Sequence, residues 1–122
     1  MAFYEKTISS EEIYDGRIIR VRRDTVEVQS GHTALREVVE HSGGVGVLAV
    51  DPEGRVPMVR QYRYPFEREI LEIPAGKLEP GEDPLECAVR ELSEETGYTA
   101  GRIIPLGELL PSPGYCRETL YV

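Results

Sequence analysis

Seven acidic residues gather between positions 79 and 97, a stretch that holds a single basic residue, Arg90. Three of them, Glu91, Glu94 and Glu95, have the spacing i, i+3 and i+4, which on a helix brings their carboxylates to adjacent turns. Like charges so close together repel one another and weaken a bare helix. Hard divalent cations such as Mg²⁺, in contrast, bind oxygen ligands of this kind. The cluster therefore predicts either a solvated acidic helix face or a site for a divalent cation.

The residues around these carboxylates predict a helix from about residue 84 to residue 96. Asp83 is a favourable N-cap residue, Pro84 suits the first helical position, and Gly97 is typical of a helix end. Glu86 completes an Asp-x-x-Glu capping pattern. Four side chains then fall on one face of the helix, which we expect to pack on the core: Leu85, Val89, Leu92 and Thr96.

The loop before this helix supplies further candidate groups. Gly76 permits an unusual backbone geometry, which would turn the carbonyl group of Ala75 toward the carboxylates. Glu82 can fold back to pair with Arg90 and so hold the loop against the helix. For Arg90 the alternative is a surface ion pair that contributes little to stability. We expect the loop and the helix to present their oxygen atoms to one point.

Residues 76–98 resemble the signature of the Nudix hydrolase family at its fixed positions, with a small departure at Tyr98, where that signature has an aliphatic residue. Gly76, Glu82, Arg90 and Gly97 all stand in register with the glutamates, which favours the cation site over the solvated face. The resemblance implies an α+β fold, an α/β/α sandwich around a mixed sheet. It also implies that water hydrolyses a pyrophosphate bond with the help of bound Mg²⁺ or Mn²⁺.

The same resemblance assigns roles to the residues of this stretch. It implies that Glu91, Glu94, Glu95 and the carbonyl group of Ala75 bind the metal ions, and that Arg90 belongs to the catalytic site. Gly76, Glu82 and Gly97 are then structural positions that shape the loop and the helix. A net-acidic chain can act on an anionic substrate in this way because the cations reverse the local field.

Residues outside this stretch resemble the ADP-ribose pyrophosphatase subfamily. The segment from Glu72 to Gly76 is similar to its Glu-x-Pro-Ala-Gly motif, and a Ser-Pro-Gly turn follows at residues 112–114. Each mark also has a plainer explanation, such as a common turn or a surface arginine. Taken together, they imply that five residues contact the substrate: Arg63, Arg36, Glu72, Pro113 and Gly114.

Two parts are expected along the chain. Residues 1–42 read as antiparallel strands with turns at Asp15-Gly16 and Ser30-Gly31, and we expect a dimerisation arm there. Residues 43–122 are expected to form the Nudix domain, with its C-terminal part missing because the chain stops within a strand. A further catalytic glutamate of the subfamily would lie beyond that point. The arm has little chain of its own for a separate core, so a homodimer is expected.

Composition excludes several classes of partner. The chain of 122 residues carries a formal net charge of −8 and has no basic stripe, which argues against nucleic acid and against an anionic membrane surface. No apolar run approaches the roughly 20 residues of a membrane span, and no signal peptide begins the chain. Cys87 and Cys116 have no metal-binding spacing, so we expect two reduced thiols in a cytoplasmic protein.

The sequence therefore favours hydrolysis of the pyrophosphate bond of ADP-ribose, or of a closely related nucleoside diphosphate sugar, to AMP and ribose 5-phosphate. One alternative is a Nudix hydrolase for another substrate, such as NADH, GDP-mannose or a dinucleoside polyphosphate. Another is a Nudix domain that senses ADP-ribose without cleaving it, and a third is a structural or interaction module. The intact set of glutamates disfavours a pure sensor, because such domains can dispense with metal-binding carboxylates.

Overall fold

The computed structural model describes residues 3–122, and their contacts divide them into two units. The first unit combines the chain up to Ser42 with Leu110–Glu118, and the second combines Gly43–Leu109 with Thr119–Val122. The chain thus passes from one unit to the other directly after residue 42, where the sequence suggested a boundary. Residues 110–118 group with the first unit by their contacts.

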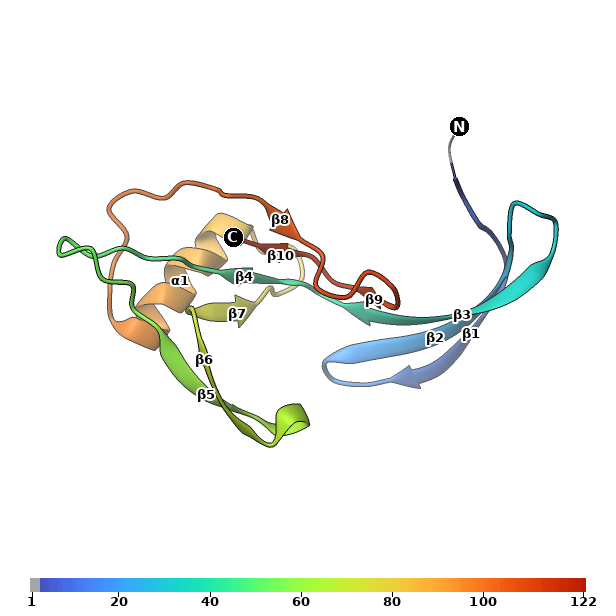
Figure 1. Ribbon diagram of the computed structural model, residues 1–122, viewed down its shortest axis with the longest axis horizontal. Helices are drawn as coiled ribbons and strands as arrows, with labels where there is room; N and C mark the ends of the chain where they lie inside the picture. The colour runs from blue at the N-terminus through green and yellow to red at the C-terminus, as the bar shows by residue number, and fades with distance from the viewer. Residues whose placement is uncertain (1–2) are drawn as a thin grey trace. The chain divides into compact units, whose positions relative to one another are not determined.

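The first unit is a four-stranded sheet in the order β1-β2-β3-β9. β1 (Lys6–Asp15), β2 (Ile19–Glu27) and β3 (Thr33–His41) are antiparallel neighbours, and the short β9 (Cys116–Arg117) runs parallel to β3. Gly31, with φ of 86°, supports the turn between β2 and β3. The expected antiparallel N-terminal strands are therefore confirmed (Figure 1).

A polar network fixes the register of these strands. Asp24 on β2 is buried and accepts hydrogen bonds from Ser10 Oγ on β1 (2.6 Å) and from Arg22 Nε (3.0 Å). Arg22 also forms an ion pair with Glu40 on β3. A slip of one residue in β2 would turn Asp24 away from Ser10 and Arg22 away from Glu40, because it moves every side chain of the strand to the opposite face. The network therefore holds β1, β2 and β3 in one alignment.

The second unit contains a mixed sheet in the order β7-β4-β10-β8, covered by one helix. β4 (Gly44–Gly46) pairs antiparallel with β7 (Ala75–Lys77) and parallel with β10 (Leu120–Tyr121), and β10 pairs antiparallel with β8 (Glu108–Leu109). The helix α1 (Pro84–Thr96) lies along β4 and β7 (Figure 1). This arrangement confirms the expected α+β fold with a mixed sheet.

Helix α1 begins and ends where the sequence predicts, and Gly97 closes it with a φ of 76°. Asp83 is the N-cap residue, but its side chain makes no capping hydrogen bond. The predicted core face is correct at Leu92, which is buried, and Thr96 is half-buried. It is wrong for Leu85 and Val89, which are 48% and 42% exposed, and it omits the buried Cys87. The packed side of α1 is therefore turned toward the glutamates, away from the face that apolar periodicity alone selects.

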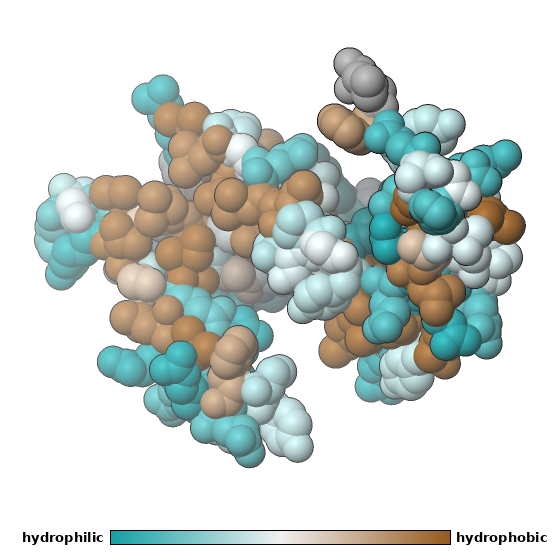
Figure 2. All heavy atoms as spheres, turned by 45° about the vertical axis from the view of Figure 1, so that its right-hand side comes forward, coloured by the Kyte–Doolittle hydropathy of each residue, from teal (hydrophilic) through white to brown (hydrophobic). Residues whose placement is uncertain are grey.

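The core of the second unit is small. Val45 on β4, Leu78 after β7 and Cys87 on α1 form its buried cluster, with Ala88 and Tyr121 packed against them. Large apolar side chains remain exposed on both units, among them Ile8, Leu35, Leu48 and Leu106, and Figure 2 shows such residues at the surface. Exposed apolar area on this scale is typical of surfaces that have a packing partner.

A hairpin completes the second unit. β5 (Val59–Arg63) and β6 (Arg68–Glu72) form a separate two-stranded antiparallel sheet, joined through a 3₁₀ turn at Tyr64–Phe66. Glu67 leaves this turn in the left-handed region, with φ of 52°. The hairpin leads directly into β7.

Within residues 3–122 α1 is the single α-helix, so one helical layer covers the mixed sheet. The second helical layer of the expected sandwich is not among these residues. None of the helical segments described is long and apolar enough to cross a membrane.

Candidate metal site

The loop before α1 is tied to the helix by an ion pair. Arg90 Nη1 on α1 donates to Glu82 Oε2, and the other oxygen of Glu82 accepts the backbone N–H of Glu79 at 3.1 Å. The hydrogen bond from Glu79, and then the positive charge of Arg90, lower the pKa of Glu82 below its ordinary value. The expected contact between Glu82 and Arg90 is present, and it holds the loop in one conformation against the helix.

Gly76 serves a different purpose from the one we expected. It lies in β7 and its φ is not positive, so it does not adopt the unusual geometry that only glycine tolerates. A Cβ atom at this position would instead collide with the Glu91 side chain, at its Cγ, Cδ and Oε1 atoms. A side chain at position 76 would therefore displace the Glu91 carboxylate, which lies directly over the strand backbone.

Glu91 and Glu95 face the sheet and are withdrawn from solvent. The Glu91 side chain is only 15% exposed and accepts a hydrogen bond from Arg90 Nη2 at 3.1 Å. Glu95 Oε2 is buried and has no hydrogen-bond partner. Burial raises the pKa of Glu95, the negative charges of Glu91 and Glu72 raise it further, and a hydrogen bond from the Ala75 backbone lowers it. These two residues therefore do not belong to a solvated acidic helix face.

Glu94 occupies a different position from its neighbours. Its side chain is 61% exposed, and its Oε1 lies 3.9 Å from Arg90 Nε. Among residues 3–122 there is accordingly no group of three or more histidine, cysteine, aspartate or glutamate side chains gathered closely enough to hold a metal ion. The side chains that come together at β7 are the pair Glu91 and Glu95.

The carbonyl group of Ala75 points away from β4. The N–H of Val47 donates to the Pro74 carbonyl, and the N–H of Leu78 donates to the Gly43 carbonyl. Hydrogen-bonded pairs alternate with non-hydrogen-bonded pairs in an antiparallel ladder, so Ala75, which is paired with Gly46, is of the second kind. Its N–H and its carbonyl therefore both lie on the outer edge of β7.

These groups fit a divalent cation. A buried carboxylate oxygen without a partner costs free energy, and a cation supplies the missing interaction. Glu91, Glu95 and the Ala75 carbonyl are oxygen ligands, as Mg²⁺ and Mn²⁺ prefer. Mg²⁺ typically takes one or two protein carboxylates and completes its coordination with water and substrate phosphates. Two carboxylates with an adjacent carbonyl therefore match its needs.

Arg63 and Glu72, both expected at the substrate, bind each other. Arg63 Nε donates to Glu72 Oε2 at 2.7 Å, and Arg63 Nη2 donates to Glu72 Oε1 at 2.5 Å. This bidentate pair raises the pKa of Arg63 and lowers that of Glu72, and the charge of Glu95 contributes to the first shift. Arg63 is thus brought near the carboxylate pair of α1.

The other expected substrate contacts belong to the first unit. Arg36 on β3 forms a bidentate pair with Glu5, with Nε–Oε2 and Nη2–Oε1 distances of 2.8 and 2.7 Å. Pro113 and Gly114 lie in the turn before β9, where the Ser112 carbonyl accepts the N–H of Cys116 at 2.9 Å. The glutamates, Ala75 and Arg63 belong to the second unit.

The sequence analysis did not predict that Cys87 is a core residue beside the glutamates. Its thiol is fully buried between loop and helix, 3.8 Å from the Lys77 carbonyl oxygen and 3.6 Å from Arg90 Nη2. Burial and the neighbouring Glu82 carboxylate raise its pKa to about 11. Position 87 is one turn before Glu91 on the same face, so the signal was available once that face was known to be packed. Cys87 and Cys116 are both free, as expected.

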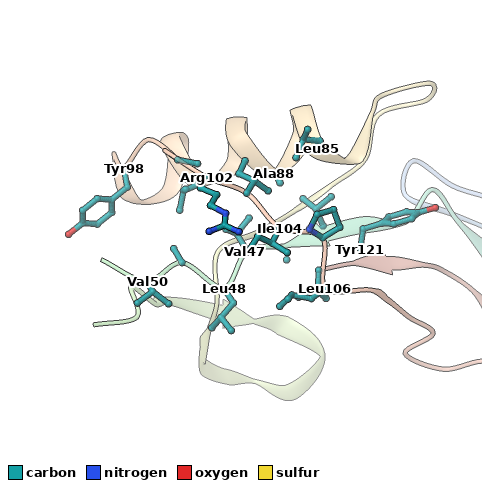
Figure 3. A pocket seen from close by; sticks show the side chains of 18 of the residues that line it. Val47, Leu48, Val50, Leu85, Ala88, Tyr98, Arg102, Ile104, Leu106 and Tyr121 are labelled. Carbon is teal, nitrogen blue, oxygen red and sulfur yellow. The ribbon is translucent and has the colours of Figure 1, made fainter. Parts of the chain in front are cut away.

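A hollow of the second unit is separate from the carboxylates. A cavity of about 770 Å³ lies beside α1, and Figure 3 shows apolar side chains around it, including Leu48, Leu85, Ile104 and Leu106. Its lining does not include Glu91, Glu95 or Arg63. Most of its lining is apolar, although Arg102 also lines it (Figure 3), and the carboxylate pair that suits a cation lies at β7 instead.

The chain belongs to the Nudix family. The family model described as NUDIX domain matches residues 40–121, and the model described as nucleoside diphosphate sugar hydrolase N-terminal domain matches residues 5–39. The two matches meet at residues 39 and 40, close to Ser42, after which the chain enters the second unit. The chain accordingly combines a Nudix domain with the N-terminal domain of nucleoside diphosphate sugar hydrolases.

Several characterised relatives are similar over nearly the whole chain. An ADP-ribose pyrophosphatase of Bacillus subtilis is 49% identical over 118 residues, which is 97% of this chain and 64% of the relative. A methanol dehydrogenase activator of Bacillus methanolicus is 48% identical, over 98% of this chain and 65% of the relative. An ADP-ribose pyrophosphatase of Mycobacterium tuberculosis is 44% identical, over 96% and 57%. The chain therefore spans less than two thirds of the length of these relatives.

A solved structure confirms the fold. The crystal structure of an ADP compounds hydrolase superposes with a TM-score of 0.85, covering 99% of this chain and 66% of that one, at 23% sequence identity. The superposition shows that the two chains share this fold, including the N-terminal strands.

Proposed function

We propose that this chain is the metal-binding part of an enzyme that hydrolyses the pyrophosphate bond of ADP-ribose, or of a closely related nucleoside diphosphate sugar. The products are AMP and ribose 5-phosphate. The observation that carries the proposal is the buried carboxylate of Glu95, one oxygen of which lacks a partner, near Glu91 at β7. The names of the relatives from Bacillus subtilis and Mycobacterium tuberculosis support this substrate class.

Glu91, Glu95 and the Ala75 carbonyl are the proposed ligands of Mg²⁺ or Mn²⁺, and Glu94 assists from the exposed side of the helix. The chemistry supplied by such a cation is neutralisation of phosphoryl charge and a lowered pKa of water. Arg90 and Glu82 keep the loop and helix in place, with Gly76 and Gly97 shaping their ends. Water attacks one phosphorus atom, and the bridging P–O bond breaks with its electrons passing to the leaving phosphate.

The remaining contacts of the proposal concern the substrate. Arg63 can bind pyrophosphate oxygens through its guanidinium N–H groups, since arginine suits phosphate through paired hydrogen bonds. Arg36, Pro113 and Gly114 contact the rest of the substrate in the complete assembly, which we propose to be a homodimer. A cytoplasmic location is part of the same proposal and agrees with the two free thiols.

A second candidate function is a regulatory one. The relative from Bacillus methanolicus is named as an activator of another enzyme, and it is nearly as similar to this chain as the pyrophosphatases are. The two candidates differ in whether the chain acts on a free nucleotide or on another protein.

The test is product analysis. Purified protein is incubated with ADP-ribose and Mg²⁺, and AMP and ribose 5-phosphate are measured by chromatography. NADH, GDP-mannose and a dinucleoside polyphosphate serve as comparison substrates. The 122-residue chain and the longest natural form are assayed in parallel, with EDTA as the control. Release of AMP that stops on chelation supports the proposal, whereas binding of ADP-ribose without cleavage by either form would favour a sensor.

A further inference from the structure

We propose that Glu72 is a positioning residue: its carboxylate draws the Arg63 guanidinium along the β5–β6 hairpin toward Glu95 and leaves a second edge of that guanidinium for pyrophosphate oxygens. This inference rests on the proposed function and gives Glu72 a role through Arg63, in place of direct contact with the substrate.

The register of the hairpin places Arg63 and Glu72 at opposite ends of the β5–β6 ladder. Arg63 is opposite Arg68 at the turn end of the hairpin, whereas Glu72 is opposite Val59 at the far end. The two paired residues are thus four positions apart along the ladder, about 13 Å at the usual rise of a strand. Since side chains alternate between faces, Arg63 and Glu72 project from the same face. The Arg63 side chain must therefore extend along this face to reach Glu72.

Charge explains the direction that Arg63 takes. Like charges directly opposite one another on neighbouring strands are unfavourable, so Arg68 disfavours a guanidinium at the turn. Glu72 attracts it toward the other end, where both carboxylate oxygens accept its N–H groups at 2.7 and 2.5 Å. The charge of Glu95 acts on the pKa of Arg63 in the same sense as Glu72 does. The guanidinium is therefore held at the hairpin end that continues into β7.

The geometry of the pair leaves N–H donors of Arg63 that can bind a phosphate. A guanidinium has five N–H donors, and Glu72 uses one on Nε and one on Nη2. The edge formed by Nη1 and Nη2 has the same fork geometry toward a phosphate. The Arg63 side chain is 44% exposed and that of Glu72 is 22% exposed. The arginine is thus anchored on its less accessible side and can receive an anion on the other.

The opposite hypothesis is that Glu72 masks Arg63, so that phosphate must displace it. The two hypotheses predict opposite signs. We suggest titrating inorganic pyrophosphate with Mg²⁺ into the 122-residue chain by calorimetry, for wild type, Glu72→Gln and Glu72→Asp. Glu69→Gln is the matched control, because Glu69 is an exposed carboxylate on the same strand that projects from the opposite face.

Positioning predicts that Glu72→Gln weakens pyrophosphate binding by about tenfold, roughly the worth of one hydrogen bond to a charged group. Glu72→Asp should recover part of the loss, and Glu69→Gln should bind as wild type does. The Arg63 Nε–H resonance should exchange slowly with water in wild type and rapidly in Glu72→Gln, at unchanged Tm. Tighter binding by Glu72→Gln establishes a mask, and unchanged binding means that Arg63 is positioned without Glu72. Either result overturns the positioning role of Glu72 and leaves the proposed function intact. Failure of wild type to bind pyrophosphate would contradict the proposed function as well.

Discussion

At the scale of single residues, Glu95 carries the strongest functional signal. Burial raises the pKa of its carboxyl group, the charges of Glu91 and Glu72 add to that shift, and one of its oxygens has no partner. An ordinary surface glutamate would be solvated and would gain from leaving such a place. Gly76 gives room for the Glu91 side chain, whose charge acts on this carboxyl group. A divalent cation would satisfy both carboxylates at once.

We predict that Glu95→Gln raises the Tm of the metal-free protein. The substitution removes a negative charge that burial and the neighbouring carboxylates disfavour. Scanning calorimetry in EDTA measures the effect, with Glu86→Gln as a control at an exposed position of the same helix. A Tm that falls in Glu95→Gln would mean that the carboxylate is stabilised by a contact other than a cation.

Cys87 gives a prediction for pH dependence. Burial raises the pKa of its thiol from 9.0 to about 11 in the folded protein, so above pH 9 the unfolded chain loses its proton first. The stabilising contribution is therefore complete below pH 9 and is lost as the pH rises toward 11. Urea unfolding between pH 8 and 11 (~0.5 unit steps) should detect this loss of stability. In Cys87→Ala the decline should be shallower, and an equal decline would assign it to other groups.

At the scale of elements, the two ends of α1 differ in how they are stabilised. The N-cap residue Asp83 makes no side-chain capping bond, whereas Gly97 adopts a φ of 76° that disfavours any residue with a Cβ atom. We predict that Asp83→Ala lowers stability by less than the ~1 kcal/mol typical of a lost cap, and that Gly97→Ala costs about 1 kcal/mol. Chemical denaturation of both variants tests the contrast, and a larger loss for Asp83→Ala would contradict it.

The same helix separates what sequence predicts from what it does not. Its ends were predictable because Pro84 and Gly97 act locally, through a fixed φ and a left-handed conformation. Its packed face was not, because that face is set by contact with β7. Periodicity selected Leu85 and Val89, but the close approach over Gly76 turns Cys87 and Glu91 inward.

The candidate site divides in the same way. The pair of Glu82 and Arg90 follows from charge and spacing in one loop and helix, and it was predictable. The pairing of Arg63 with Glu72 depends on hairpin register, and that of Arg36 with Glu5 depends on sheet order. Spacing along the chain does not encode either contact. The expected substrate arginines are therefore found with carboxylate partners that sequence alone did not suggest.

At the scale of the whole molecule, the first unit exposes apolar side chains that we expect a second surface to cover. Every residue of β1 is exposed, including Ile8, Ile13 and Tyr14, and Leu35 on β3 is exposed as well. A sheet of this kind is stable when a second surface covers it. Isologous pairing about a two-fold axis is the commonest arrangement that provides one.

We therefore predict a homodimer through the first unit. Sedimentation equilibrium at micromolar concentration should give twice the mass of 13.7 kDa for the chain. Ile8→Glu together with Ile13→Glu should shift the protein toward monomer, because each places a charge in the buried surface. Arg68→Glu, in the second unit, is the matched control. Wild type that sediments as a monomer would refute the dimer.

We propose that the buried carboxylates of α1 hold a divalent cation, and Mn²⁺ binding followed by electron paramagnetic resonance tests this most directly. The measurement needs no substrate and no turnover. Wild type should bind Mn²⁺, Glu86→Gln should bind it equally well, and Glu95→Gln should bind it about tenfold more weakly or worse, since a charged oxygen ligand is lost. Equal affinity in wild type and Glu95→Gln, or an equal loss in Glu86→Gln, would contradict the assignment of the metal to this site.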